Sequence, residues 1–550
     1  MTDPITVFTA RRIHTMDPSL PEATAIAVRD GRIIEVGNLE SLQPWLTRHE
    51  HRIDDRFAEQ VLVPGLIDPH VHPSMMAGLL ACEWITGEAW DLPECHVPAV
   101  IGAEAFMDRV RDLEAGLPDG EPLVAYGHHP QFHGPIHRSM LDAVSTTRPI
   151  IIWPRGYHEF RCNGAALTWL NAEEGAAWDP YIDLESGRMW ESGMAWGMRV
   201  LNRHLLGGGR IERHLAGIAG MIHRGGVTTV CDAGFGIGGP DRDVATFEAL
   251  YGDASTPFRL YLIPSVMIFR SLYGDDAQER MATMAAASDG RIRHLHAAKF
   301  FADGSFMSQL SQLGEPGFID GHTGAWMTDP DRLVHEMRPS WEEGRQINIH
   351  VTGDGGLQTT LDAIETLLHE TPRFDHRTVI QHFALSTQAQ VRRLAALGCA
   401  VQGNGYYMHQ FGDVMVDEWL GTERAGQITR VGSARRNGVS VALHSDLPMG
   451  PIKPLLGASL LATRSTSSGR VPAPSECLTP YDAMAAVTIE AAWQLRLDHE
   501  IGSLAAGKLA DMTVLDADPF EMDPAGWPDI GIPATIRDGQ VHEIDAATRT

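Results

Sequence analysis

The chain has 550 residues, of which 43% are hydrophobic and 21% are charged, as in globular proteins. Its formal net charge of −27 argues against nucleic acids and anionic membranes as partners, because their phosphates would be repelled. The sequence lacks an N-terminal signal-peptide pattern, an apolar run of the roughly 18 residues that span a bilayer, and CxxC pairs among its scattered cysteines. We therefore predict a cytoplasmic protein with reduced thiols.

Short strand patterns at both ends of the chain predict one small β-domain. Asp-Gly pairs, typical of hairpin turns, interrupt a pattern at each end, at Asp30-Gly31 and Asp538-Gly539. We expect residues 1–63 and 491–550 to form the two parts of a β-sandwich. Two unrelated β appendages are the alternative.

The middle of the chain alternates short apolar strands with longer helical patterns, which is typical of βα units. The expected strands lie at residues 61–72, 225–234, 258–267, 293–304, 345–354, 378–385, 399–405 and 440–448. Eight strands suffice for an α/β fold of the (βα)8 TIM-barrel type, over residues 64–74 and 216–490. An open parallel sheet would have the same periodicity. The long stretch after the first strand predicts an inserted subdomain, residues 75–215, over the barrel mouth.

The first barrel strand ends in two histidines. In VLVPGLIDPHVH, residues 61–72, His70 and His72 are two positions apart and so share one face of the strand. Two imidazoles aimed at one point make half of a metal site, although a chance HxH is not rare among 26 histidines.

Further ligand-type residues follow in later predicted strands or just after them. They are Lys299, His350, His382 and Asp446. The C-terminal strand ends of a (βα)8 barrel converge on one rim, so these residues are expected to meet there. Histidine and carboxylate ligands with an open position are typical of a catalytic zinc site. A lone strand-end histidine is more often structural, but an ordered set of this kind is not.

This ordered set resembles the amidohydrolase superfamily. The segments KFFADGS (299–305), HVTGD (350–354), HSDLP (444–448) and IGSLAAGKLADMTVLDADP (501–519) are similar to the amidohydrolase 3 family, and the resemblance runs nearly end to end. It implies the barrel, the insert and the shared terminal domain described above.

The resemblance also implies roles for the ligand-type residues. His70 and His72 would hold the more buried metal, and His350 and His382 the second. Asp446 would bind the first metal and act as general base and acid. Lys299 would be carbamylated by CO2 and bridge two divalent ions, with zinc expected and manganese, iron or cobalt compatible.

We therefore predict a metal-dependent hydrolase that cleaves the C–N bond of an amide, N-acyl or N-formyl amine by attack of a metal-bound hydroxide. A cyclic amide or amidine hydrolase, or a deaminase, is the alternative on the same metal centre. A non-catalytic scaffold is the alternative of another class. The expected partner is a small amide-type substrate, and a homodimer is compatible with the resemblance.

Residues outside the ligand set are assigned to the substrate. His158 is expected to act in catalysis as a donor to the substrate carbonyl, with a packing histidine as the alternative. Trp84, Tyr406, His409 and His444 are expected to bind substrate, and Tyr407 is a further pocket candidate. His444 also departs from the glycine of many relatives.

Four histidines of the insert and two aspartates are expected to have structural or supporting roles. The insert histidines His128, His129, His133 and His137 are expected on a polar loop. Asp303 and Asp354 are candidates for orienting a ligand histidine, with ordinary turn residues as the alternative.

Overall fold

A computed structural model describes residues 3–288 and 290–545. The chain divides into two compact units. The first unit contains the residues up to His72, Ala219–Gly304 and the residues from Ser311 onward. The second unit contains Pro73–Ile218 and Ser305–Leu310. The division into barrel, insert and terminal β-domain at the expected residue bounds stays a prediction.

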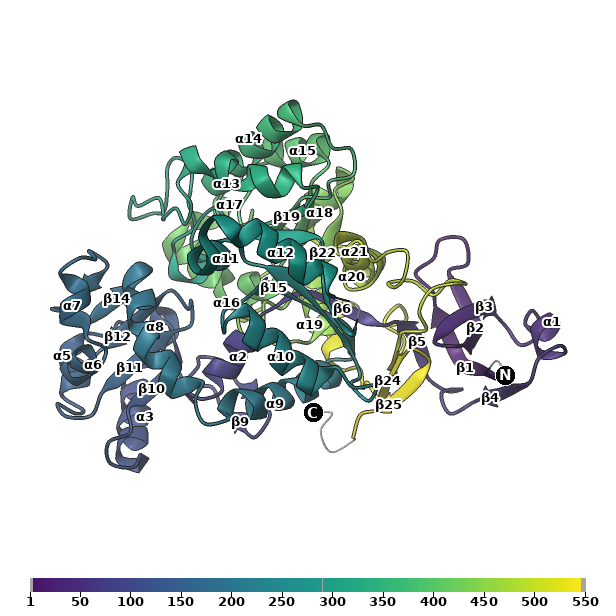
Figure 1. Cartoon of the computed structure of the whole chain (residues 1–550), viewed down its shortest axis with the longest axis horizontal. Helices are drawn as coiled ribbons and strands as arrows, with labels where there is room; N and C mark the ends of the chain where they lie inside the picture. The colour runs from purple at the N-terminus through teal and green to yellow at the C-terminus, as the bar shows by residue number, and fades with distance from the viewer. Residues whose placement is uncertain (1–2, 289, 546–550) are drawn as a thin grey trace. The chain divides into compact units, whose positions relative to one another are not determined.

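One sheet of the first unit takes strands from both ends of the chain. Strand β5 pairs antiparallel with β23, so that Val61 lies opposite Leu515 and Pro64 opposite Met512. Figure 1 shows these purple and yellow strands next to each other. The strands of this sheet are β1 (Ile5–His14), β2 (Glu22–Arg29), β3 (Arg32–Gly37), β4 (His51–Asp54), β5 (Val61–Pro64), β23 (Met512–Leu515), β24 (Ala534–Arg537) and β25 (Gln540–Glu543).

The predicted strand 61–72 consists of two strands that belong to different sheets. Gly65 separates β5 from β6 (Leu66–Val71), and a Cβ at Gly65 would lie 2.0 Å from the Thr228 hydroxyl oxygen. Only glycine permits this close approach. The apolar run therefore crosses from the terminal sheet into a parallel sheet, and apolar periodicity gives no sign of the crossing.

Two parallel sheets follow one another in chain order in the first unit. Every strand that the sequence predicted for the central region overlaps one of their strands. The strands are β6, β15 (Val227–Phe235), β16 (Arg259–Pro264) and β17 (Ile292–His294) in one sheet, and β18 (Ala297–Phe301), β19 (Gln346–Val351), β20 (Val379–His382), β21 (Ala400–Gly403) and β22 (Val441–Leu443) in the other. The strands are short, apolar and almost wholly buried, as expected for parallel sheets covered by helices.

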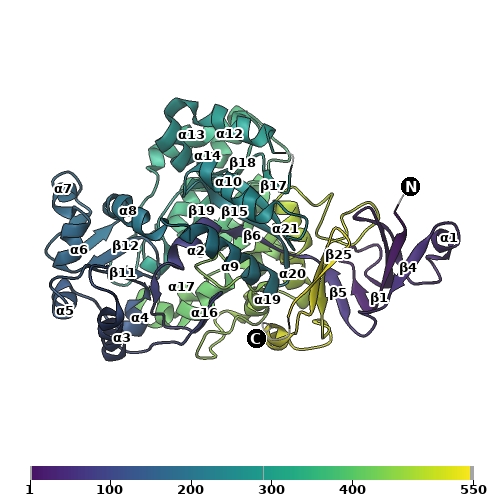
Figure 2. The same cartoon turned by 60° about the horizontal axis from the view of Figure 1, so that its bottom comes forward.

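Helices alternate with these strands, and this confirms the predicted α/β class. Helices α13 and α14 pack against each other and against β19, and Figures 1 and 2 show them beside it from two directions. The longer helices of the first unit are α10 (Pro240–Tyr251), α11 (Val266–Tyr273), α12 (Ala277–Ala286), α13 (Pro330–Glu342), α14 (Asp354–Glu370), α15 (Gln388–Leu397), α16 (Gly405–Val414), α19 (Pro454–Thr463) and α20 (Pro480–Ala486). Shorter ones are α1 (Gln43–Leu46), α17 (Gly421–Ala425), α18 (Val431–Arg436) and α21 (Ile489–Gln494).

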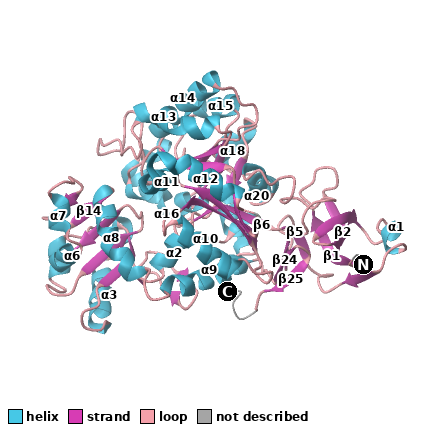
Figure 3. Ribbon diagram, in the orientation of Figure 1, coloured by secondary structure: helices cyan, strands magenta, loops and turns pink. Residues whose placement is uncertain are grey.

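The second unit has its own mixed sheet. Figure 3 shows its magenta strands flanked by cyan helices. The strands of the sheet are β7 (Glu83–Trp84), β10 (Leu123–His128), β11 (Ile150–Pro154), β12 (Glu159–Cys162), β13 (Ile182–Asp183) and β14 (Arg188–Trp190), and β8 (Trp90–Asp91) pairs separately with β9 (His96–Val97). The helices are α2 (Pro73–Leu79), α3 (Ala103–Gly116), α4 (Pro130–His133), α5 (Arg138–Asp142), α6 (Gly164–Trp169), α7 (Ala172–Ala176), α8 (Ser192–Leu205) and most of α9 (Arg210–Arg224).

The helices that the structure describes are too short or too polar to span a bilayer. Within residues 3–288 and 290–545, no helix is long and apolar enough to cross a membrane.

Candidate metal centre

Three ligand-type atoms of the first unit form a nearly equilateral triangle. The Nε2 atoms of His70 and His72 are 3.1 Å apart, and the Oδ1 atom of Asp446 lies 3.4 Å from the first and 3.3 Å from the second. Bonds of about 2.0–2.1 Å in a tetrahedral site place neighbouring ligand atoms about 3.3–3.4 Å apart. The triangle therefore has the dimensions of three ligands around one ion.

Two further histidines stand beside this triangle. His350 belongs to β19 and His382 ends β20, and their ring centroids are 4.3 Å apart. The His382 ring lies 5.0 Å from the His70 ring, and its Nδ1 atom is 3.6 Å from Oδ2 of Asp446. The structure thus brings together the four histidines that the sequence placed on three separate strands.

Lys299 is buried in the middle of β18 rather than at its end. Its ammonium donates to Oε1 of Gln381, the residue before His382. Burial lowers the pKa of Lys299 to about 7, although the nearby carboxylates of Asp446 and Asp232 act in the opposite direction. The Lys299 amine is therefore close enough to the carboxylates of Asp446 and Asp232 for their charges to affect its pKa.

Asp232, which the sequence analysis missed, faces His72. Its Oδ1 atom lies 3.5 Å from His72 Nδ1, on the opposite side of the ring from the triangle. Burial alone would lower the pKa of His72, but hydrogen bonds to Asp232 and Asp446 raise it to about 9. A carboxylate on the far nitrogen is the usual partner of a metal-ligating histidine, because it fixes the tautomer and leaves Nε2 free to ligate.

The carboxylate of Asp446 is ionised in this setting. Burial raises its pKa, and the hydrogen bond and charge of His72 more than offset this, so that the pKa lies below its ordinary value. Burial lowers the pKa of His70 and of His382 well below that of free histidine. Neutral imidazoles and an anionic carboxylate are the protonation states that bind a divalent cation, and His72, whose pKa is raised, would release its proton as an ion binds.

His444 also belongs to this cluster. Its ring stacks on that of His70, with centroids 4.6 Å apart and 12° between the planes. Ligand atoms of His70, His444 and Asp446 lie within 4.8 Å of one another. Neither ring nitrogen of His444 has a hydrogen-bond partner among the described residues. We call His70, His72, His350, His382, His444 and Asp446 the strand-end cluster.

Two residues of the strand-end cluster have left-handed backbone. The φ angle is 71° at His382 and 58° at Asp446. Such conformations are costly for residues other than glycine, and they cluster at active sites as well as in turns.

The three predicted pocket residues of α16 have different surroundings. The hydroxyl of Tyr407 lies 3.1 Å from Asp446 Oδ2 and 3.1 Å from His382 Nδ1. Nδ1 of His409 is 2.9 Å from the carbonyl oxygen of Ser465. Tyr406 lines a cavity of about 30 Å3. Tyr407 therefore contacts two members of the strand-end cluster, Asp446 and His382.

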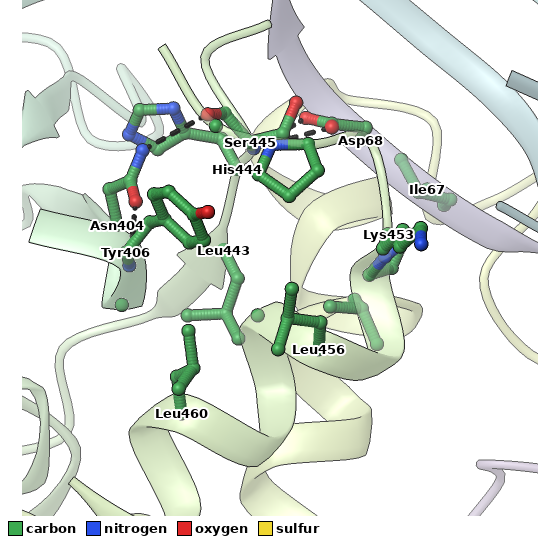
Figure 4. Close-up of a pocket in the computed structure, with 16 residues that line it drawn as sticks. Ile67, Asp68, Asn404, Tyr406, Leu443, His444, Ser445, Lys453, Leu456 and Leu460 are labelled. Atoms are coloured by element: carbon green, nitrogen blue, oxygen red, sulfur yellow. Dashed lines mark hydrogen bonds between the residues drawn. The ribbon is translucent and has the colours of Figure 1, made fainter. Parts of the chain in front are cut away.

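The cavity beside Tyr406 is shown in Figure 4. Leucines 443, 456 and 460 line it, together with Asp68 and His444. Asp68 accepts the Ser445 N–H, and Asn404 donates to the Ser445 carbonyl, which fixes the backbone next to Asp446. About 30 Å3 holds roughly one water molecule, so this cavity is too small for a substrate.

Asp303 and Asp354 bind backbone groups. Asp303 accepts the N–H groups of Thr352 and Gly353, at 2.9 and 2.7 Å, and Asp354 accepts that of Gly314 at 3.0 Å. Asp303 therefore fixes the turn that follows His350, and burial raises its pKa to about 7.

Two predicted substrate residues belong to the second unit. His158 Nδ1 lies 3.1 Å from Oε1 of Glu191, and Glu191 has a left-handed φ of 46°. The Trp84 indole is buried against the rings of Trp90 and Tyr126 and donates to the Leu79 carbonyl. Their roles at the substrate stay predictions.

The expectation that the insert histidines lie on a polar loop is wrong for His128, His129 and His133, which are buried. His133 accepts the His129 N–H and lies 3.0 Å from the Val100 carbonyl. His129 accepts the Gln131 N–H and lies 3.2 Å from the Met307 carbonyl, and His128 lies 2.9 Å from the Gly134 carbonyl. These imidazoles hold the backbone of the second unit together.

Known proteins resemble the chain over nearly its whole length. The model of the amidohydrolase family matches residues 58–542. The protein YtcJ of Bacillus subtilis is 24% identical over 552 residues, which cover 96% of this chain and 97% of that protein. The N-substituted formamide deformylase of Arthrobacter pascens is 24% identical over 547 residues, covering 96% of each.

A solved structure has the same fold. It is an uncharacterised metal-dependent hydrolase from Pyrococcus horikoshii, with a TM-score of 0.71 at 18% identity, covering 94% of this chain and 99% of that one.

Proposed function

Because the chain belongs to the amidohydrolase family, we propose that it is a metal-dependent hydrolase that cleaves the C–N bond of an amide, N-acyl or N-formyl amine. The observation that carries the proposal is the triangle of His70 Nε2, His72 Nε2 and Asp446 Oδ1, with sides of 3.1–3.4 Å. The deformylase of Arthrobacter pascens, named for a substituted formamide, supports the N-formyl amine among these substrates.

The two parallel sheets are proposed to close into one (βα)8 barrel. A β-bridge between Ser265 and Lys299 links the end of β16 to β18. At the other side, the Asp446 N–H donates to the His70 carbonyl at 3.1 Å, which links the end of β22 to β6. In a closed barrel all strand ends share one rim, and this accounts for the convergence of the cluster.

The donor set fits divalent ions. His70, His72 and Asp446 would hold one ion, and His350 with His382 a second. Imidazole and carboxylate ligands suit zinc, manganese, iron or cobalt. A bound ion would supply a Lewis acid for the substrate carbonyl and would lower the pKa of water.

Lys299 is proposed to act after reaction with CO2. The ammonium first loses one proton to become a neutral amine. The amine nitrogen then bonds to the carbon of CO2, one C–O π pair moves onto oxygen, and the nitrogen loses a second proton, so that a cation becomes an anionic carbamate. Its burial beside Gln381, on a strand next to that of His350, supports a place between the two groups of ligands.

The chain's own residues carry the proton transfers. Asp446 Oδ1 takes a proton from the water whose oxygen attacks the carbonyl carbon, and returns it to the amine nitrogen as the C–N bond breaks. Asp232 holds the ring of His72, so that its Nε2 atom stays directed at the centre.

A substrate panel with removal and return of metal tests the proposal. The protein is assayed for amine release from N-formyl and N-acyl amines as purified, after chelation and after addition of zinc or manganese. We expect release from at least one class, loss after chelation and recovery on addition. Release that survives chelation, or ion-loaded protein inactive on every class, would contradict it.

A further inference from the structure

One hydroxyl group contacts two members of the strand-end cluster at once. The oxygen of Tyr407 lies 3.1 Å from Oδ2 of Asp446 and 3.1 Å from Nδ1 of His382. The Tyr407 side chain is buried, with 4% exposure. It extends from α16, whereas the two residues that it contacts follow β22 and end β20.

The chemistry of these three groups fixes where the hydrogens lie. A tyrosine has a single O–H hydrogen, and a carboxylate only accepts. The hydroxyl therefore donates to Asp446, and its oxygen is left to accept from His382 Nδ1. A neutral imidazole carries one N–H, so a hydrogen on Nδ1 leaves the Nε2 lone pair free.

The same contact orients Asp446. The Tyr407 hydroxyl donates to Oδ2 of Asp446. The other oxygen, Oδ1, is the one that lies 3.4 Å from His70 Nε2 and 3.3 Å from His72 Nε2. A carboxylate that is free to rotate about its terminal bond would not keep one oxygen in that triangle.

Backbone conformation gives an independent reason why His382 and Asp446 need a side chain that holds them in place. Both partners of Tyr407 have left-handed φ angles, 71° at His382 and 58° at Asp446. Each such residue costs about 1–3 kcal/mol and persists only where its surroundings hold it. Tyr407 joins the two strained residues through their side chains.

We propose that Tyr407 is a positioning residue that sets the tautomer of His382 and the orientation of Asp446 together, and so controls how tightly the centre binds a divalent ion. This inference rests on the proposed function, because it concerns the same centre. It assigns one hydroxyl to both expected ion sites, since His382 and Asp446 are expected to serve different ions.

The test compares Tyr407→Phe with the adjacent Tyr406→Phe. Each variant removes one oxygen from α16, but Tyr406 lines the small cavity of Figure 4. Metal-free protein is titrated with zinc against a competing chelator. Because loss of a group that orients a ligand typically costs about 10–100-fold in metal affinity, we expect that loss in Tyr407→Phe and wild-type affinity in Tyr406→Phe. Equal affinities in Tyr407→Phe and wild type would overturn the inference.

A second measurement needs no change at Tyr407. Nitrogen-15 NMR of the metal-free wild-type protein, with His382 assigned from His382→Gln, should show the hydrogen on Nδ1. A hydrogen on Nε2 would overturn the inference even if Tyr407→Phe fails to fold. Wild-type protein that binds no zinc would contradict the proposed function instead, whereas the tautomer would still test Tyr407.

Discussion

Each unit of the chain contains a group of buried histidines, and the two groups have different partners. In the second unit, the ring nitrogens of His129 and His133 bind backbone N–H or carbonyl groups. In the strand-end cluster, the Nε2 atoms of His70 and His72 face each other and a carboxylate. Burial is common to both groups, so burial alone does not identify a metal site.

The difference has an energetic meaning. Imidazoles bound to the backbone satisfy buried polar groups and stabilise the fold. In the strand-end cluster, imidazole nitrogens and a carboxylate oxygen face one another instead of the backbone, and a bound divalent ion would take the place of the proton that His72 holds. We therefore expect replacements in the second unit to affect stability and replacements in the strand-end cluster to affect ion binding and turnover.

The largest expected effect is on turnover. Asp446→Asn removes the carboxylate that we propose takes and returns the proton, so amine release should fall by about 10²–10⁴-fold. The ion content should change little, because the amide oxygen can still ligate. Amine release and metal analysis of the same preparation check this, and full activity in the variant would refute the assignment of the base.

A matched pair of histidine replacements tests the comparison itself. His350→Ala should lose about one ion per chain, because it removes a proposed ligand of the second ion. His129→Ala should keep all its ions but lose about 1–3 kcal/mol of unfolding free energy for each buried backbone group left without a partner. Metal analysis and urea unfolding of both variants measure the two effects, and the reverse pattern would break the comparison.

Replacement of the buried lysine should have an intermediate effect. Lys299→Ala removes the expected bridge, so ion content should fall, and a short carboxylic acid in solution should restore part of it. Lys453→Ala, at the small cavity, is the control and should keep its ions. If Lys299→Ala keeps a full ion load, the lysine does not bridge.

The last prediction concerns the pH dependence of stability in the second unit. Burial lowers the pKa of His128 to about 3 and that of His129 to about 4, from 6.5. Between about pH 4 and 6.5 the unfolded chain therefore binds protons that the folded chain does not. The free energy of unfolding should fall as pH drops through this range, by up to about 1.4 kcal/mol per pH unit for each histidine, and be unaffected by them above it.

Urea unfolding of wild type and of His129→Asn between pH 4.5 and 7 checks the slope. The variant should depend less on pH, since it lacks one of the groups. An equally steep slope in both proteins would show that His129 is not the group responsible.

The histidines and the aspartate of the ordered ligand set could be predicted from the sequence, because each of them lies at or near the end of an apolar strand. The HxH of residues 70–72 and the later His350, His382 and Asp446 meet as expected. The family is confirmed by the match over residues 58–542.

The contacts of the residues that support the cluster could not be predicted from the sequence, for physical reasons. Asp232 is one acidic residue in an apolar strand, and nothing in its neighbours shows that it faces His72. Tyr406 and Tyr407 are adjacent on α16, about 100° apart around the helix axis, and sequence does not give the rotation of the helix. The partner of a buried insert histidine can also be distant in the chain, as the Met307 carbonyl is from His129, and the sequence does not show such a pairing.

The central claim is that the strand-end cluster binds metal, and metal stoichiometry of freshly purified protein tests it most directly. Plasma mass spectrometry should find about two divalent ions per chain, as expected for the two proposed groups of ligands with Lys299 as the proposed bridge. Essentially no bound metal, even after purification with added zinc or manganese, would contradict the claim.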